Sequence, residues 1–234
     1  MRLLSRETIR RLRAPVDRYL SFSKLKAFHR TEHTLDEIVD QAMNFGGHGY
    51  FRVTTTQVRS EILNLAKSVA ALKPKNILEI GTARGGTLFI WSQLASKRVI
   101  SCDINDLSRQ RPLYEQFASP KSNCDCRLVI GNSHDPSFAA SVEKMFDGEK
   151  VDFLFIDGDH TEVGVRQDYE LYKHMVRPGG LIAFHDIVEN QPLPENQVFE
   201  FWKHLRPTVE FEEFVDNKQQ CGFGIGIVRV KSAA

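Results

Sequence analysis

The chain has 234 residues, of which 41% are hydrophobic and 26% are charged, and its formal net charge is +1. This composition is typical of an ordinary globular protein and allows one domain with a short N-terminal extension. No stretch approaches the ~20 apolar residues that span a bilayer, and the N-terminus lacks the apolar core of a secretion signal, so we expect a cytoplasmic protein. The four cysteines are too few and too irregular for a disulfide framework or a zinc motif, and we expect reduced thiols. They are Cys102, Cys124, Cys126 and Cys221.

Residues 1–30 carry an excess of positive charge. They hold nine Lys or Arg against Glu7 and Asp17, a local charge of +7 that leaves −6 for the remainder. We expect a solvated basic helix that packs through Leu3, Leu4, Ile9 and Leu12. The alternative is contact with an anionic surface such as a membrane or nucleic acid, although no clear nucleic-acid partner is indicated. Residues 1–53 are therefore predicted to form a helical, basic extension that serves as a lid or an interface.

Residues 54–234 are predicted to form the main domain, after a glycine-rich break at 45–50. Helical spacing begins at Val58, with the threonines at 54–56 as the expected N-cap, and ends at Lys73-Pro74. Apolar runs typical of strands then alternate with segments long enough for helices. The strand-like runs are 76–80, 98–102, 126–130, 151–156 and 180–185, and the helical segments lie around 86–96, 107–118, 136–146 and 162–176.

The apolar runs predict an α/β fold with a doubly wound, mostly parallel sheet. Parallel strands with helices on both faces are apolar throughout rather than alternating, as these runs are. Five strand–helix alternations imply right-handed crossovers. Two further strands, at 208–215 and 222–230, predict a closing antiparallel hairpin.

The first strand runs into a glycine turn, Gly81-Thr82-Ala83-Arg84-Gly85-Gly86. Glycine lets the backbone approach a ligand where a Cβ would clash, and ligands of such sheets lie at the carboxyl ends of the strands. A dinucleotide fingerprint needs glycine where Ala83 stands, and a P-loop needs a lysine that is missing. S-adenosylmethionine fits better, because it has no phosphate and carries cationic groups. Glu79 would orient its amino group, directly or through water.

Polar residues after the next two strands favour an adenosine ligand. Asp103 ends the second strand, where a carboxylate accepts both ribose hydroxyl protons. NAD enzymes use the same device, so Asp103 does not choose between these cofactors. Asn132 and Ser133 follow the third strand, where they would bind the edge of the adenine or cap the next helix, which begins at Asp135-Pro136.

The fourth and fifth strand-like runs both end in acidic and imidazole groups. Asp157 and His160 follow the fourth run, and His185 and Asp186 end the fifth. Neighbouring strand ends lie about 5 Å apart, so the two aspartates converge and a hard divalent cation, Mg²⁺ above all, would relieve their repulsion. We predict Asp157, Asp186 and His185 as metal ligands and His160 as the general base. A metal lowers the pKa of an acceptor hydroxyl and positions it for methyl transfer.

The run from Asn76 to Asp186 resembles the class I S-adenosylmethionine-dependent methyltransferases. The most specific match is IDGDHTEVGVRQDYELYKHMVRPGGLIAFHDI, which is similar to the group of catechol O-methyltransferase, the macrolide-sugar O-methyltransferases and the cephalosporin hydroxylase-like proteins. The resemblance implies a seven-stranded sheet, and it implies His160 as the base. It also extends cofactor binding to Gln57, whose helix resembles the lead-in helix of catechol-type enzymes. Catechol-type enzymes have Asp-Asn where this chain has Asp186-Ile187, so the third metal ligand is open among Asp159, His185, Glu189 and water.

From the motifs and the resemblance we expect an S-adenosylmethionine-dependent O-methyltransferase. Its expected acceptor is a small molecule with a hydroxyl group, such as a sugar, and its cofactors are S-adenosylmethionine and a divalent metal, in the first place Mg²⁺. The expected cofactor contacts are Gln57, Glu79, Gly81, Thr82, Gly85, Asp103, Asn132, Ser133 and Asp157, and Asp157 is expected to act in catalysis with His160. The alternatives are an NAD-dependent oxidoreductase and a non-catalytic binding module, and homo-oligomerisation is left open.

Overall fold

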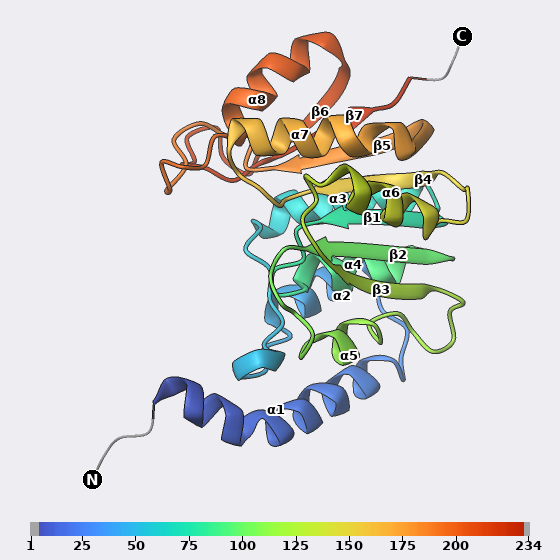
Figure 1. Ribbon diagram of the computed structural model, residues 1–234, viewed down its shortest axis with the longest axis vertical. Helices are drawn as coiled ribbons and strands as arrows, with labels where there is room; N and C mark the ends of the chain where they lie inside the picture. The colour runs from blue at the N-terminus through green and yellow to red at the C-terminus, as the bar shows by residue number, and fades with distance from the viewer. Residues whose placement is uncertain (1–4, 232–234) are drawn as a thin grey trace.

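A central seven-stranded sheet organises the computed structural model, which describes residues 5–231 (Figure 1). The strand order is β3-β2-β1-β4-β5-β7-β6. Strands β1 to β5 are parallel, and β7 runs antiparallel between β5 and β6. The strands are β1 (Asn76–Ile80), β2 (Arg98–Asp103), β3 (Asp125–Ile130), β4 (Val151–Ile156), β5 (Val176–His185), β6 (Glu210–Phe214) and β7 (Ile225–Arg229). The predicted fold class is confirmed, including the antiparallel hairpin at the C-terminal end.

Helices cover both faces of the sheet because alternate strand residues point to opposite sides. Ile77, Val99 and Phe155 face one core with helices α1 to α5, and Leu78, Ile100 and Leu154 face the other with helices α6 to α8. The bounds are α1 (Arg6–Phe28), α2 (Leu35–Asn44), α3 (Arg59–Ala71), α4 (Gly86–Leu94), α5 (Arg111–Tyr114), α6 (Pro136–Lys144), α7 (Glu162–Tyr172) and α8 (Val198–Leu205). Three single 3₁₀ turns complete the described elements: η1 (Gly49–Phe51), η2 (Lys173–Met175) and η3 (Arg206–Thr208).

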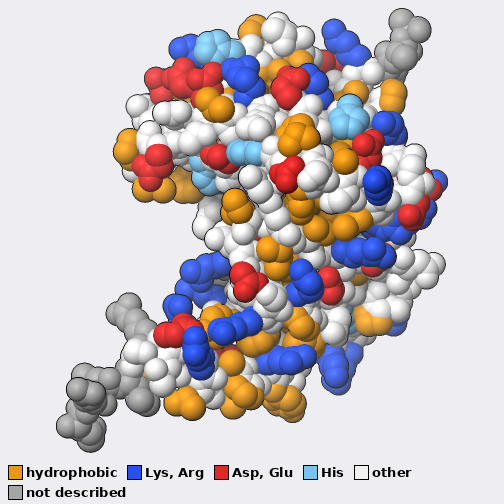
Figure 2. Space-filling model, viewed as in Figure 1, with side chains coloured by type: hydrophobic (Ala, Val, Ile, Leu, Met, Phe, Trp, Pro, Cys, Tyr) orange, Lys and Arg blue, Asp and Glu red, His pale blue; other side chains and the backbone are white. Residues whose placement is uncertain are grey.

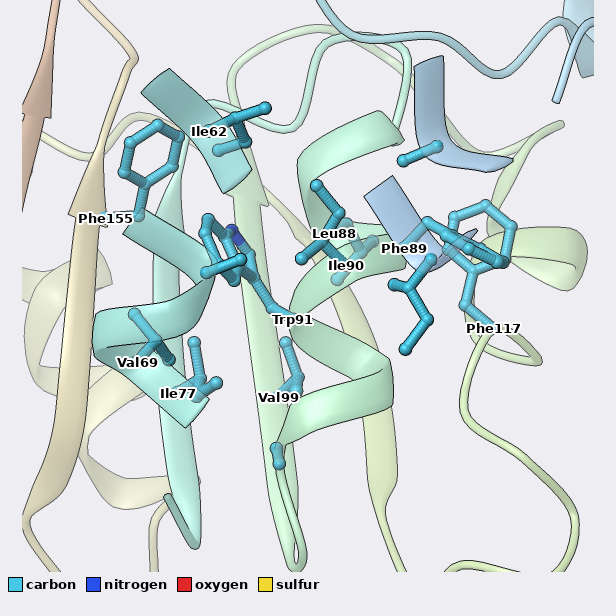
Figure 3. Packing of buried hydrophobic residues seen from close by; sticks show 14 of the residues in the cluster. Ile62, Val69, Ile77, Leu88, Phe89, Ile90, Trp91, Val99, Phe117 and Phe155 are labelled. Atoms are coloured by element: carbon cyan, nitrogen blue, oxygen red, sulfur yellow. The ribbon is translucent and has the colours of Figure 1, made fainter. Parts of the chain in front are cut away.

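Trp91 of α4 is the largest side chain of the first core. It is fully buried and packs edge-on against Phe153 and Phe155 of β4 (Figure 3). Phe89 of the same helix points the other way, towards Phe117, with its ring centroid 5.3 Å from that of Phe117. A helix with seven buried residues among nine is held by packing on every side, which fixes the glycine turn that precedes it.

Two sequence expectations about helices are wrong. Helix α3 begins at Arg59 after Val58, whose side chain makes no cap, because Thr54 is engaged elsewhere: it bridges to Gly85 and donates to the carbonyl of Met43. The helix expected at 107–118 is reduced to the four residues of α5, and single-turn hydrogen bonds from Gln116 to Leu113 and from Phe117 to Tyr114 follow it.

Helix α1 lies along the edge of the molecule beyond β3, where Figure 1 shows it bowed around α5. Asp17, Ser21 and Leu25 are its buried residues. The expectation that Ile9 and Leu12 pack inward is wrong, since both are exposed, and Leu3 and Leu4 lie outside the described residues. No helix within residues 5–231 is both long and apolar enough to cross a membrane.

A buried glutamate ties the C-terminal hairpin to the main body. Glu61 of α3 accepts hydrogen bonds from the backbone N–H groups of Asp216 and Gly224 and from the side chain of Gln220. All three donors lie in the connection between β6 and β7. This connection therefore adopts one arrangement beside the end of β5, where Asp186 stands.

Candidate active site

The carboxyl ends of β1 to β4 enclose a cavity of about 450 Å³, within the size range of small-molecule sites. The order in which successive strands are added to the sheet reverses between β1 and β4. Open α/β sheets bind their ligands at such a switch point. Figure 2 shows this side of the molecule hollowed between an upper and a lower part. The walls include Gly81, Ala83, Asp103, Asn105, Gly131, Asn132, Ser133, His134, Asp157, Gly158, Asp159 and His160.

The glycines of the first turn make room for the protein's own chain. A Cβ on Gly81 would lie 2.0 Å from the carbonyl oxygen of Asp157, and one on Gly85 would lie 2.8 Å from the ring of Tyr114. The expectation that they make room for a ligand therefore receives no support from their packing. Gly81 lines the cavity, whereas Gly85 does not. Ala83 adopts φ +45°, the left-handed region that glycine prefers.

Asp103 fixes the conformation of that turn. Its Oδ2 accepts from the backbone N–H groups of Thr82 at 3.1 Å and Ala83 at 2.8 Å. Its Oδ1 accepts from the backbone and side chain of Asn105 at 2.8 and 2.9 Å. The carboxylate is thus held in the cavity wall, and Asn132 and Ser133 line the same cavity just beyond the end of β3, the strand that pairs with β2. The predicted ribose and adenine contacts therefore follow neighbouring strands.

Glu79 lies beneath the turn and does not line the cavity. It is completely buried, accepts from Trp91 Nε1 at 2.9 Å and from the Ser101 hydroxyl, and lies among apolar residues. Burial raises the pKa of Glu79 to about 8, against the opposing effect of hydrogen bonds from Ser101, Thr87 and Trp91. The predicted direct contact with a donor's amino group therefore has no support in the geometry, and a structural role under the turn is what the contacts support.

Asp157 and Asp186 come together at the ends of β4 and β5 with two histidines between them. His160 Nε2 lies 3.2 Å from Asp157 Oδ1 and 3.7 Å from Asp186 Oδ2. His185 Nδ1 lies 3.3 Å from Asp157 Oδ1 and 3.2 Å from Asp186 Oδ1. The sequence analysis predicted this group, because adjacent parallel strands place their last residues side by side.

The carboxylates and histidines shift each other's pKa strongly. Burial alone would raise the pKa of Asp157, but the charge of His185 and the hydrogen bond from His160 lower it far below the usual range. Burial alone would lower the pKa of His185, but Asp157 and Asp186 raise it to about 10. The hydrogen bond to Asp157 raises the pKa of His160, against the effect of burial. The site thus stabilises positive charge between its two carboxylates.

Two amide side chains hold the carboxylates from outside. Gln57 Nε2 donates to Asp157 Oδ2 at 2.7 Å, and Asn196 Nδ2 donates to Asp186 Oδ2 at 2.6 Å. Gln57 was predicted as a cofactor contact and lies with Thr82 in a second cavity of about 100 Å³ that shares Gly81, Ala83 and Asp157 with the first. Asn196 was missed, because nothing in the local sequence of its loop tells where its side chain turns.

A second buried acid near the cavity was also missed. Asp168 of α7 has no exposed surface, and its Oδ1 lies 3.4 Å from Nε2 of His134, a cavity residue. Burial raises the pKa of Asp168 to about 6, against hydrogen bonding from Ser133 and the charge of His134. Asp168 lies in the middle of a helix between polar neighbours, so the sequence did not indicate that its side chain lies beneath the turn after β3.

Three of the acids and histidines at the ends of β4 and β5 are placed to bind a metal ion. Among the described residues, Asp157, His160 and Asp186 each offer a ligand atom, and these atoms lie within 4.8 Å of one another. The two carboxylate oxygens suit Mg²⁺ or Mn²⁺, whereas an imidazole nitrogen is a ligand of softer divalent cations such as Zn²⁺ or Fe²⁺. The predicted ligand His185 lies on the buried side of the group, and its Nε2 has no hydrogen-bond partner within residues 5–231.

Comparisons with known proteins agree with this fold. Residues 78–187 match the model of a family described as a methyltransferase domain. An O-methyltransferase from Bacillus cereus, in complex with SAH, superposes with a TM-score of 0.56 at 19% identity over 93% of this chain and 97% of its own. MycE, a methyltransferase of the mycinamycin biosynthetic pathway in complex with Mg, SAH and mycinamycin VI, gives 0.59 at 17% identity over 86% of this chain and 54% of its own.

A curated relative of unknown activity matches as well. An uncharacterised protein of Acanthamoeba polyphaga mimivirus is 30% identical over 123 residues, which are 50% of this chain and 54% of that protein. The chain therefore spans about half the length of this relative and of MycE. The match to a methyltransferase domain runs from within β1 to just beyond the end of β5, and the O-methyltransferases share the fold of this sheet.

Proposed function

We propose that this protein transfers a methyl group from S-adenosylmethionine to a hydroxyl oxygen of a small molecule, with a divalent metal at Asp157 and Asp186. The observation that carries the proposal is the position of Asp157. It lines both cavities and belongs to the group of acids and imidazoles at the ends of β4 and β5. A donor in the cavities and an acceptor at the acids would therefore meet beside one residue.

The donor fits the two connected cavities. Asp103, Asn132 and Ser133 would hold the adenosine in the larger cavity, and Gln57 and Thr82 would contact the amino-acid portion in the smaller one. S-adenosylmethionine supplies an activated methyl group on its sulfonium. The SAH bound by the O-methyltransferases that share this fold supports the assignment. Because Asp103 is rigidly held by Thr82, Ala83 and Asn105, it presents its carboxylate without reorganisation.

Asp157 and Asp186 would hold the metal, as the Mg in MycE suggests by analogy. Held by these residues, a divalent cation would lower the pKa of an acceptor hydroxyl. Gln57 and Asn196 keep the two carboxylates in place. His185 rather than His160 would complete the set of protein ligands, because a metal on His160 Nε2 would occupy the atom that has to take the proton. Of the two, His160 is half exposed and faces the cavity, so it also has access to an acceptor.

His160 is the proposed general base. Its ring is oriented by Asp157 and faces the cavity, so a neutral ring is placed to take the hydroxyl proton of an acceptor. Since Asp157 raises the pKa of His160, the neutral form is favoured only at higher pH in the absence of another cation. Methyl transfer is expected to rise with pH across the titration of this ring.

Calorimetry tests the donor site before any acceptor is known. SAH is expected to bind the purified chain, and NAD is not. Asp103→Asn should weaken SAH binding by at least about tenfold, since it removes a charge from the cavity wall, while Asp106→Asn, an exposed acid in the same loop, serves as the matched control. NAD binding in place of SAH would refute the donor assignment.

The metal and the acceptor need a second experiment. Methyl transfer from labelled S-adenosylmethionine to a panel of catechols and hydroxylated sugars is expected to require Mg²⁺ or Mn²⁺. Asp157→Asn should abolish this activity, and His160→Ala should lower it by about 10²–10⁴-fold. Full activity in the presence of a chelator would refute the role of the metal. Methyl transfer to nitrogen or carbon acceptors alone would refute the hydroxyl group as the acceptor.

A further inference from the structure

Helix α1 carries a row of exposed apolar side chains on the side turned away from the sheet. Its exposed apolar side chains are Ile9, Leu12, Val16, Tyr19 and Leu20. At about 100° per residue, these five positions fall within about 100° of the helix circumference. We call them the α1 stripe. Asp17, Ser21 and Leu25, which dock α1 on the protein, lie on the opposite side.

The exposure of the α1 stripe is large for a surface helix. Leu12 is 67% exposed and Tyr19 is 71% exposed. Single exposed apolar residues are ordinary, but a continuous row along one helix marks a surface that is covered by something else. Figure 2 shows hydrophobic side chains gathered along the edge formed by α1, next to a band of Lys and Arg side chains.

The charges around the α1 stripe are positive. Helix α1 contains seven Lys or Arg residues and only two acids, Glu7 and Asp17. Both acids already have partners: Glu7 accepts from Arg11 and Tyr50, and buried Asp17 lies 3.6 Å from Arg13. By helix position, Arg13 borders the stripe on one side and Lys26 on the other, whereas Lys24 donates to the carbonyls of Asn44 and Phe45.

These charges indicate which kind of partner can cover the α1 stripe. A second copy laid face to face would bring these Lys and Arg residues against their equivalents, with neither acid of α1 free to pair with them. An anionic lipid surface offers apolar depth for the stripe and negative headgroups for its borders. An amphipathic helix that lies in a membrane interface has this arrangement of apolar and basic residues.

We propose that α1 docks the protein on an anionic lipid surface, with Ile9, Leu12, Val16, Tyr19 and Leu20 inserted at the level of the headgroups. The helix is about 34 Å long at 1.5 Å per residue, so it would lie in the plane of the interface rather than cross it. Tyr19 suits this depth, because its ring is apolar and its hydroxyl stays hydrated.

Vesicle flotation with the full chain tests the proposal. Wild type is expected to float with vesicles of phosphatidylcholine and phosphatidylglycerol in equal parts, and at least about tenfold less with phosphatidylcholine alone or at high salt. The variant Leu12→Ser/Val16→Ser/Tyr19→Ser should lose at least about tenfold in binding to the anionic vesicles.

The matched control removes exposed apolar side chains elsewhere. Val163→Ser/Phe211→Ser takes two such residues from α7 and β6 and should float as wild type does. Unchanged thermal unfolding of both variants shows that they fold. The proposal is overturned if wild type ignores anionic vesicles or if the triple variant floats equally well. It is also overturned if sedimentation shows a wild-type dimer that the triple variant loses, since the stripe then joins copies of the chain.

Discussion

Replacing Glu79 by Gln should stabilise the protein at neutral pH. The carboxyl of Glu79 is completely buried, and its pKa is raised from 4.5 to about 8. Below pH 4.5 the group is neutral in both the folded and the unfolded chain. As the pH rises above 4.5, the unfolded chain releases the proton and the folded chain keeps it, so stability falls until about pH 8. At about 1.4 kcal/mol per pH unit, the loss at pH 7 is about 3 kcal/mol.

The variant removes this loss and keeps the contacts. The amide oxygen of Gln accepts from Trp91, and its nitrogen donates to Ser101, whose hydroxyl is also hydrogen-bonded to Thr82. Urea unfolding followed by tryptophan fluorescence, at several pH values from 4.5 to 8.5, measures the difference between the two proteins. We expect equal stability at the acid end and a gap that widens to about 3 kcal/mol at pH 7. A gap that does not change with pH would show that Glu79 is ionised in the folded protein.

Three further substitutions test the turn and the cavity wall. Gly85→Ala should cost about 1–3 kcal/mol more than Gly148→Ala in urea unfolding, because both glycines have positive φ but only Gly85 would meet Tyr114; equal costs would mean that the ring yields. Ala83→Gly should stabilise by up to about 1 kcal/mol, since Ala83 has φ +45°, and a lower melting temperature would contradict this. Asp168→Asn should match wild type near pH 4 and exceed it by up to about 3 kcal/mol at pH 8, because burial raises the pKa of Asp168 to about 6; no pH-dependent difference would show a carboxylate that stays charged.

The fold was predictable where burial alone decides the structure. The runs at 76–80 and 151–156 are β1 and β4 to the residue, because central parallel strands are apolar along their whole length. Strand β5 begins at Val176, earlier than predicted, because its Pro-Gly-Gly segment joins the sheet across a shift in register with β4. Helix α8 was not predicted.

The site was predictable where strand order alone brings residues together. Asp157 and Asp186 end adjacent strands, and their meeting follows from the sheet. The contacts of Asn196 and Asp168 depend on a loop and on a helix packed over it, and no local pattern reports them. The glycine turn was predicted correctly, but the reason given for it was not supported. Gly81 has no room for a side chain because the backbone of Asp157 passes over it.

Glu61 limits how the connection between β6 and β7 can be exchanged. The connection between β6 and β7 is anchored by one carboxylate on α3, more than 150 positions earlier in the chain. A loop of different length or sequence, exchanged from a related enzyme, would leave that carboxylate buried without donors unless the new loop supplied its own N–H groups there. Redesign of this connection should therefore treat Glu61 and residues 216–224 as one transferable unit.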